Sequence, residues 1–128
     1  MKNKKAFSLV EILVVVGIIA LLSAIAMPNL IRAKVSANES AARATLKLIS
    51  NSLENYSAIN SVYPNDTSLL LGASPPYLTI DYFTGNHNGY TYNKTLGVYF
   101  YTITATPINT NTGTTTFTMS TGGVLSPQ

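Results

Sequence analysis

Two ionisable side chains stand out for the chemistry that their positions could support. Glu11 is a carboxylate at the edge of an uncharged run, Ile12 to Ile31. A charge in such a segment is costly unless it meets an opposite charge, so it marks a candidate functional residue. His87 is the only histidine, and the chain has no cysteine. This composition provides no thiolate metal site and no disulfide framework, and we expect no enzymatic activity.

The net charge of the chain has a local origin. The formal charge is +3, and only 10% of the 128 residues are charged, against about 25% in a typical domain. Lys2, Lys4 and Lys5 supply the whole excess, because residues 7–128 carry five basic and five acidic side chains. The basicity therefore gives no indication of nucleic-acid binding.

The uncharged run is long enough to enter a membrane. Its 20 residues match the thickness of a bilayer core, and the lysines before it keep that end in the cytoplasm. One interpretation is a secretory signal peptide, with an A-x-A cleavage signal at Ala24 to Ala26. That interpretation gives Glu11 no role.

A second interpretation does give Glu11 a role. The run Ala6-Phe7-Ser8-Leu9-Val10-Glu11 resembles the cleavage and methylation motif of type IV prepilins and type II secretion pseudopilins. The resemblance implies that a prepilin peptidase removes the leader, residues 1–6, between Ala6 and Phe7. It also implies that the new amino group of Phe7 is methylated and that Glu11 becomes the fifth mature residue. The family usually has glycine where this chain has Ala6, which leaves the efficiency of cleavage open.

The role of Glu11 has three possible forms. Its carboxylate could pair with the α-amino group of Phe7 in the same chain, one helical turn away. In the resembled family it is taken to pair with the N-terminus of a neighbouring subunit, which sets the stagger during assembly. Alternatively, Glu11 caps the first helical turn, where negative charge is favoured. We expect the assembly role.

The periodicity predicts one helix from Phe7 to about Ile59, roughly 80 Å long. Residues 7–30 form its transmembrane and polymerisation part, in which Pro28 predicts a kink or local melting. Residues 31–60 are amphipathic. The predicted apolar face consists of Ala42, Leu46, Ile49, Leu53 and Tyr56. The predicted solvated or subunit-contacting face, with an ion pair between Glu39 and Arg43, consists of Arg32, Glu39, Arg43, Lys47 and Glu54.

Residues 61–128 read as a small head of short strands. A helical turn is expected at Leu69–Leu71 and a tight turn at Asn88-Gly89. The predicted strands are Tyr90–Asn93, Val98–Thr106, Thr114–Ser120 and a final edge at Val124–Leu125. The fold class is therefore α+β: a long N-terminal helix whose second half packs on an antiparallel sheet of three or four strands. We also expect one edge of this uncharged sheet to be covered by the chain itself or by a neighbouring subunit.

Few side chains in the head could carry chemistry. Asp81, Asn86 and Asn88 form a loop of oxygen donors, and the resemblance to major pseudopilins makes a calcium site there one expectation. Turn formation is the simpler explanation, and no other cofactor is expected. His87 is expected to be exposed and inert. The alternating Tyr90, Tyr92, Tyr99 and Tyr101 are expected to pack within the sheet rather than to bind a ligand.

The resemblance implies a structural subunit of a type IV pilus-like filament for adhesion, motility or surface contact. The implied partners are further copies of the chain, prepilin peptidase, the inner membrane, and the inner-membrane assembly platform with its assembly ATPase. The chain would lie in the inner membrane before assembly and then in an extracellular pilus. One alternative is a pseudopilin of a type II secretion or DNA-uptake system, in a periplasmic filament. Another is a monomeric secreted or membrane-anchored binding module.

Overall fold

The computed structural model describes residues 6–128. The first five residues of the expected leader, with Lys2, Lys4 and Lys5, lie outside the described residues. The chain divides into two compact units, the first ending at Ala33 and the second spanning Lys34–Gln128. Each unit is described by itself below.

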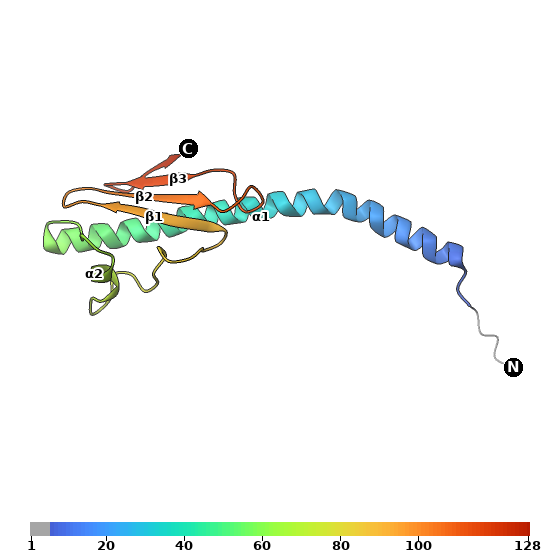
Figure 1. The fold of residues 1–128 in the computed structure, drawn as a ribbon, viewed down its shortest axis with the longest axis horizontal. Helices are drawn as coiled ribbons and strands as arrows, with labels where there is room; N and C mark the ends of the chain where they lie inside the picture. The colour runs from blue at the N-terminus through green and yellow to red at the C-terminus, as the bar shows by residue number, and fades with distance from the viewer. Residues whose placement is uncertain (1–5) are drawn as a thin grey trace. The chain divides into compact units, whose positions relative to one another are not determined.

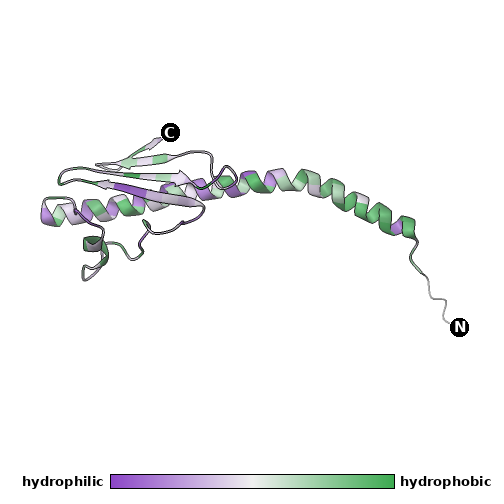
Figure 2. Cartoon of the chain, viewed as in Figure 1, coloured by the Kyte–Doolittle hydropathy of each residue, from purple (hydrophilic) through white to green (hydrophobic). Residues whose placement is uncertain are grey.

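One long helix, α1 (Leu9–Asn60, 52 residues), contributes to both units. It begins two residues later than the sequence predicts and ends one residue later, and Pro28 lies inside it. The residues on both sides of Pro28 are helical, and a kink at this residue stays a prediction. Figure 2 shows the hydropathy of α1: its first half is almost continuously apolar, whereas polar and apolar residues alternate in its second half.

The head is an antiparallel meander that follows α1. Its strands are β1 (Tyr90–Leu96), β2 (Tyr101–Pro107), β3 (Phe117–Ser120) and β4 (Val124–Pro127). The sheet order is β1-β2-β3-β4, so each strand pairs with the next one in sequence. A short helix, α2 (Ser68–Leu71), lies in the segment between α1 and the sheet, and the C-terminal half of α1 runs along the sheet (Figure 1). The α+β prediction is confirmed, with four strands.

The core lies between α1 and one face of the sheet. The predicted apolar face is confirmed, because four of its five residues are buried and Tyr56 packs against them. Alternate residues of β1, β2 and β3 contribute the opposite side of the core. The buried apolar side chains are Ala42, Leu46, Ile49, Leu53, Leu70, Leu78, Tyr90, Tyr92, Tyr101, Ile103, Ala105, Phe117 and Met119. Each large side chain in this set stabilises the head by about 1.5–3 kcal/mol through burial.

The strand boundaries correct the sequence prediction in two places. Thr114 to Thr116 were predicted as strand, but they precede β3, which begins at Phe117. Val98 to Phe100 was predicted to open a strand, but it forms the turn between β1 and β2, closed by a hydrogen bond from Gly97 N–H to the Phe100 carbonyl (2.8 Å). The Phe100 ring covers the backbone of Gly97, where a Cβ atom would lie 2.3 Å from Phe100 Cε1. A larger residue at position 97 would therefore require the exposed Phe100 ring to move.

Candidate functional site

The start of α1 is capped by two hydrogen bonds that involve Ser8. Val10 N–H donates to Ser8 Oγ (3.3 Å), and Ser8 N–H donates to Glu11 Oε2 (2.8 Å). This arrangement is a variant of the capping box, because the Ser8 hydroxyl accepts from Val10 N–H instead of Glu11 N–H. It satisfies two backbone donors at the start of the helix. A capping role for Glu11 was one of the predictions, whereas its partner Ser8 was not predicted. The Ser-x-x-Glu spacing before an apolar run is a signal that could have identified it.

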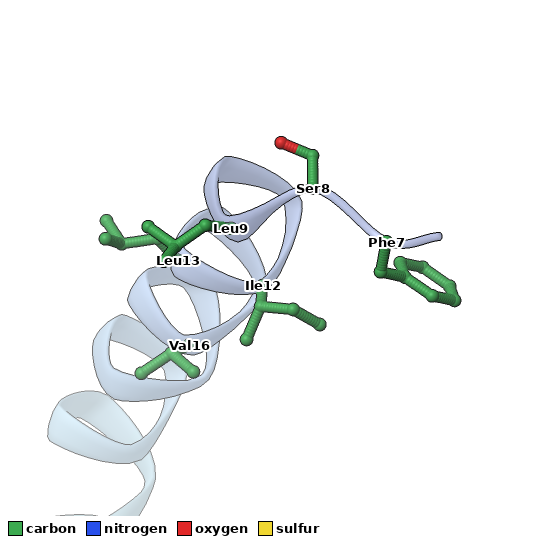
Figure 3. Close-up of a pocket in the computed structure, with 6 residues that line it drawn as sticks. All are labelled: Phe7, Ser8, Leu9, Ile12, Leu13 and Val16. Atoms are coloured by element: carbon green, nitrogen blue, oxygen red, sulfur yellow. The ribbon is translucent and has the colours of Figure 1, made fainter. Parts of the chain in front are cut away.

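Ala6 and Phe7 precede this cap in an exposed, non-helical segment. The Phe7 side chain is 82% exposed. With Ser8, Leu9, Ile12, Leu13 and Val16 it lines a shallow apolar pocket (Figure 3). The backbone between Ala6 and Phe7 is therefore accessible, while Glu11 lies one helical turn further along.

The apolar part of α1 is exposed along its whole length. The large apolar side chains on every side of the helix, from Leu9 to Ile31, have exposed fractions between 44% and 78%. By length and composition α1 contains a segment that could cross a membrane. A helix that is apolar on all sides needs lipid or other apolar helices around it.

In the head unit, two acidic residues of α1 contact the sheet connections. Glu39 Oε1 accepts hydrogen bonds from Thr114 N–H (3.1 Å) and Thr114 Oγ1 (2.9 Å). The backbone hydrogen bond from Thr114 lowers the pKa of Glu39. Beside it, Asn38 Nδ2 donates to the Thr112 carbonyl (2.8 Å). These contacts fasten the connection between β2 and β3 to α1.

Glu54 fastens the turn between β3 and β4. Its carboxylate accepts hydrogen bonds from Tyr63 Oη (3.0 and 3.1 Å), Tyr101 Oη (3.0 Å) and Gly122 N–H (3.0 Å). Ser50 Oγ lies 2.7 Å from Tyr101 Oη and completes the network. Burial, and after it the hydrogen bond to the Glu54 carboxylate, raises the pKa of Tyr63 to about 12.

These contacts correct the predicted charged face. Glu39 and Glu54 have the same spacing as Arg43 and Lys47, but their partly exposed carboxylates accept hydrogen bonds from the head. The predicted ion pair between Glu39 and Arg43 is replaced by other contacts. Arg43 donates to Ser40 Oγ (3.4 Å) and lies over the Phe117 ring, 5.3 Å from its centroid.

Comparison with known proteins supports the family that the N-terminal motif resembles. Residues 1–27 match the family model described as the prokaryotic N-terminal methylation motif. The chain is 32% identical over 94 residues to the "Type IV wide pilus major component PilA4" of Thermus thermophilus, across 70% of this chain and 72% of that protein. The chain belongs to the type IV pilin and pseudopilin family. It is also 36% identical over 64 residues to the "Type II secretion system core protein G" of Vibrio cholerae, across 50% of this chain and 44% of that protein.

The Asp81 loop of this pilin-family head is built by turn chemistry. Asp81 Oδ2 accepts a hydrogen bond from Thr84 Oγ1 (2.7 Å) and Oδ1 accepts one from Phe83 N–H (3.0 Å), and these bonds lower the pKa of Asp81. The predicted turn at Asn88-Gly89 is present, with both residues at positive φ. A calcium site at Asp81, Asn86 and Asn88 stays a prediction. In the described part of the chain, no three histidine or acidic side chains are grouped as a metal site would require.

Two side chains of this pilin-family head lie differently from the prediction. His87 is half-buried rather than exposed, because its ring packs edge-on against Tyr82 with centroids 5.1 Å apart. Tyr99 does not pack within the sheet, because it lies in the turn after β1 and is 77% exposed. Tyr90, Tyr92 and Tyr101 are buried in the core as expected.

Proposed function

We propose that this chain is the structural subunit of a type IV pilus-like filament, assembled through residues 7–30 after the leader is removed. The exposure of the apolar part of α1 carries this proposal. Twelve of its large apolar side chains are Leu9, Val10, Ile12, Leu13, Val14, Val15, Val16, Ile18, Ile19, Leu21, Leu22 and Ile25, and all are more than half exposed. Lipid covers this surface before assembly, and the same helices of neighbouring copies cover it in the filament.

Removal of the leader between Ala6 and Phe7 sets up the assembly contact. The new α-amino group at Phe7 is a cation, which N-methylation preserves. It lies next to the capping box of its own helix, in which Glu11 already accepts a hydrogen bond from Ser8 N–H. A carboxylate has a second oxygen, so Glu11 can cap its own helix and also pair with the Phe7 amino group of a neighbouring copy. Prepilin peptidase, the inner-membrane assembly platform and its ATPase are the partners that this route requires.

The similarity to a type II secretion core protein supports a second candidate function, that of a pseudopilin in a periplasmic filament. Both functions use the same processing and the same helix. They differ in the location of the filament, which is extracellular for a pilus and periplasmic for a pseudopilus, and in the process that the filament serves.

The test is to shear cells that produce the chain, examine the sheared material by electron microscopy, and sequence the N-terminus of its main protein. The filament function predicts long fibres whose subunit begins at Phe7. Secretion of a substrate that stops when the gene is deleted, without surface fibres, supports the pseudopilin. A subunit that begins at Met27 contradicts both, because cleavage there removes Glu11.

The residue before the cut provides a matched variant. Ala6→Gly restores the residue usual in the family, and we expect it to raise the processed fraction without changing the start at Phe7. Ala6→Leu places a bulky side chain there, and we expect the precursor to accumulate uncut.

A further inference from the structure

We propose that the sheet of the head continues from one subunit to the next, with β4 of one copy adding as an antiparallel strand beside β1 of its neighbour. This inference rests on the filament function proposed above. It names an interaction surface within the second unit, Lys34–Gln128, and a second copy of this chain as the partner. Below, the β1 edge is the outer side of Lys94 and Leu96, and the β4 edge is the outer side of Leu125 and Pro127.

The hydrogen bonds of Tyr90 show which residues of β1 point away from β2. In an antiparallel pair, backbone groups of alternate residues point to the partner strand and those between them point outward. Tyr90 N–H donates to the His87 carbonyl (3.1 Å), and His87 N–H donates to the Tyr90 carbonyl (2.9 Å), on the side opposite β2. Tyr92, Lys94 and Leu96 follow Tyr90 in the same phase, so their backbone groups also point outward.

The chain covers the outer side of β1 at both ends and leaves its middle open. Tyr92 is only 3% exposed. Past the other end, Tyr63 N–H donates to the Val98 carbonyl (2.9 Å). Between these points, no hydrogen bond among the described residues reaches the outward backbone groups of Lys94 and Leu96. The β1 edge therefore has two donors and two acceptors free for a further strand.

The β4 edge is open over a matching length. Gln128 N–H donates to the Thr116 carbonyl (2.8 Å) and Thr116 N–H donates to the Gln128 carbonyl (3.3 Å), so the even residues of β4 face β3. Leu125 and Pro127 face outward, and every residue of β4 is exposed. Leu125 contributes an N–H and a C=O, whereas Pro127 contributes only its C=O because proline has no N–H. Within the described chain these outward groups have no hydrogen-bond partner.

The free groups of the two edges fit in one register. With Leu125 opposite Leu96, the two residues exchange a pair of hydrogen bonds, and Lys94 N–H donates to the Pro127 carbonyl. Only the Lys94 carbonyl is then left to water, and Lys94 is exposed. A shift by two residues in the other direction would place Pro127 against the buried Tyr92. The open lengths of the two edges therefore select this register.

The same register covers both exposed apolar side chains of β4. Leu125 (39% exposed) and Leu96 point to the core side of the sheet, because their cross-strand partners are buried there, so they meet each other. On the outer face, Val124 (57% exposed) comes opposite Gly97. The Phe100 ring, whose residue is 53% exposed, lies over the backbone of Gly97 and is the apolar neighbour of Val124 there.

This geometry selects a second copy as the partner. β1 and β4 run in opposite directions in the four-stranded order, so a copy of the same orientation presents its β4 antiparallel to β1. The contact joins two different edges and leaves one of each free, which produces an open array. Leu125 shares a cross-strand row with Lys94 in its own sheet, so pairing with Leu96 shifts successive copies by two residues, about 7 Å along the strands.

A pair of cysteines tests the contact directly, because the chain has no cysteine of its own. Thr95→Cys combined with Ser126→Cys places the two thiols at directly opposed residues of the junction, with Cα atoms about 4.5 Å apart. Within one chain these residues are three strands apart, about 14 Å, which no disulfide spans. Oxidation of sheared filaments should therefore join successive copies into a ladder of dimers, trimers and larger oligomers on a non-reducing gel.

The matched control is Asn93→Cys combined with Ser126→Cys. Asn93 is exposed on the same face of β1, but it is the diagonal neighbour of Ser126 in this register, about 7–8 Å away. That separation is too long for a disulfide, so the control filaments should stay monomeric on the gel.

A backbone variant tests the hydrogen bonds themselves. Leu125→Pro removes the outward N–H without touching a hydrogen bond between β3 and β4, and we expect about tenfold less sheared filament. Leu125→Ala is its control, because it shortens the side chain and keeps the N–H, and it should cause a smaller loss.

The outcomes separate the inference from the proposed function. Filaments that form without a ladder from the Thr95 and Ser126 pair overturn the inference, as do an equal ladder from the control pair and normal filaments from Leu125→Pro. If the cysteine variant forms no filaments, deuterium exchange of the wild type decides: the Lys94 and Leu125 amides should exchange more slowly in filaments than in detergent micelles, and equal exchange overturns the inference. If wild-type cells form no filaments of any kind, the proposed function has failed and the inference falls with it.

Discussion

Tyr101 in β2 donates a hydrogen bond to Glu54 in α1 at 3.0 Å, across 47 residues of sequence. This bond joins the middle of the sheet to the last turns of the long helix. The same carboxylate receives Tyr63 and the backbone of Gly122, so one side chain connects three segments of the head to α1.

Removal of the Glu54 carboxylate should loosen the head. Glu54→Ala leaves the hydroxyls of Tyr63 and Tyr101 without their acceptor, and hydrogen bonds to charged groups contribute about 1.5–3 kcal/mol each. Because Glu54 is partly exposed, water compensates in part, and we expect a loss of about 2 kcal/mol in the free energy of unfolding. Glu54→Gln should lose about half as much, since its amide oxygen still accepts.

Denaturant titration of the full chain in detergent, followed by tyrosine fluorescence, measures this loss. Asn55→Ala is the control, because Asn55 is exposed on the neighbouring position of the same helix. Equal midpoints for Glu54→Ala and the wild type would show that the network contributes nothing.

The head should lose stability in alkali. Burial raises the pKa of Tyr63 to about 12 and also raises the pKa values of Tyr90, Tyr92 and Tyr101 above the ordinary value of 10. A group whose pKa is higher in the folded state stabilises fully below its unfolded pKa. Its contribution is lost as the pH rises through the folded pKa, so stability should fall between about pH 10 and pH 12.

Unfolding midpoints measured across this pH range test the sign, with tyrosinate absorbance recorded in parallel. Tyr63→Phe should make the loss of stability over this pH range smaller, because it removes one of the titrating hydroxyls. A midpoint that is constant up to pH 12 contradicts the burial of these hydroxyls.

The apolar face of α1 should be far more sensitive to truncation than its outer face. Leu46 is fully buried, and Leu48 is 44% exposed two residues further along the same helix. Leu46→Ala removes a core side chain and leaves a cavity, for which we expect a loss of about 2–5 kcal/mol. Leu48→Ala should change the free energy of unfolding by less than about 1 kcal/mol. Comparable losses in the two variants would mean that the sheet does not pack on the predicted face.

Helix periodicity was sufficient to predict which apolar residues of α1 face the sheet, because positions on a helix are fixed by the backbone. It could not separate Glu39 and Glu54 from Arg43 and Lys47, which have the same spacing. Their partners, Thr114 and Gly122, lie in connections whose course depends on the tertiary fold.

The predicted strand at Val98 to Phe100 was wrong for a different reason. Val98, Tyr99 and Phe100 have strand-forming side chains, and composition alone continues the strand through them. In the structure the Phe100 ring lies against the backbone of Gly97, and a hydrogen bond from Gly97 N–H to the Phe100 carbonyl closes a turn there. At the N-terminus the Ser8-x-x-Glu11 cap is also local, and its spacing is a known signal that could have been recognised from four residues.

The central claim is that Glu11 acts in assembly and does more than cap its own helix. Ser8 and Glu11 separate these two roles, because both belong to the capping box and only Glu11 carries charge. Ser8→Ala removes one capping acceptor and keeps the carboxylate. Glu11→Gln keeps an acceptor oxygen for Ser8 N–H and removes the charge.

The most direct measurement is the amount of filament sheared from cells that produce each variant, with membrane-bound subunit quantified in the same cells. We predict near-normal filaments from Ser8→Ala. We predict none from Glu11→Gln, although its subunit is processed at Phe7 and accumulates in the membrane. Normal filaments from Glu11→Gln would contradict the claim and leave Glu11 as a helix cap alone.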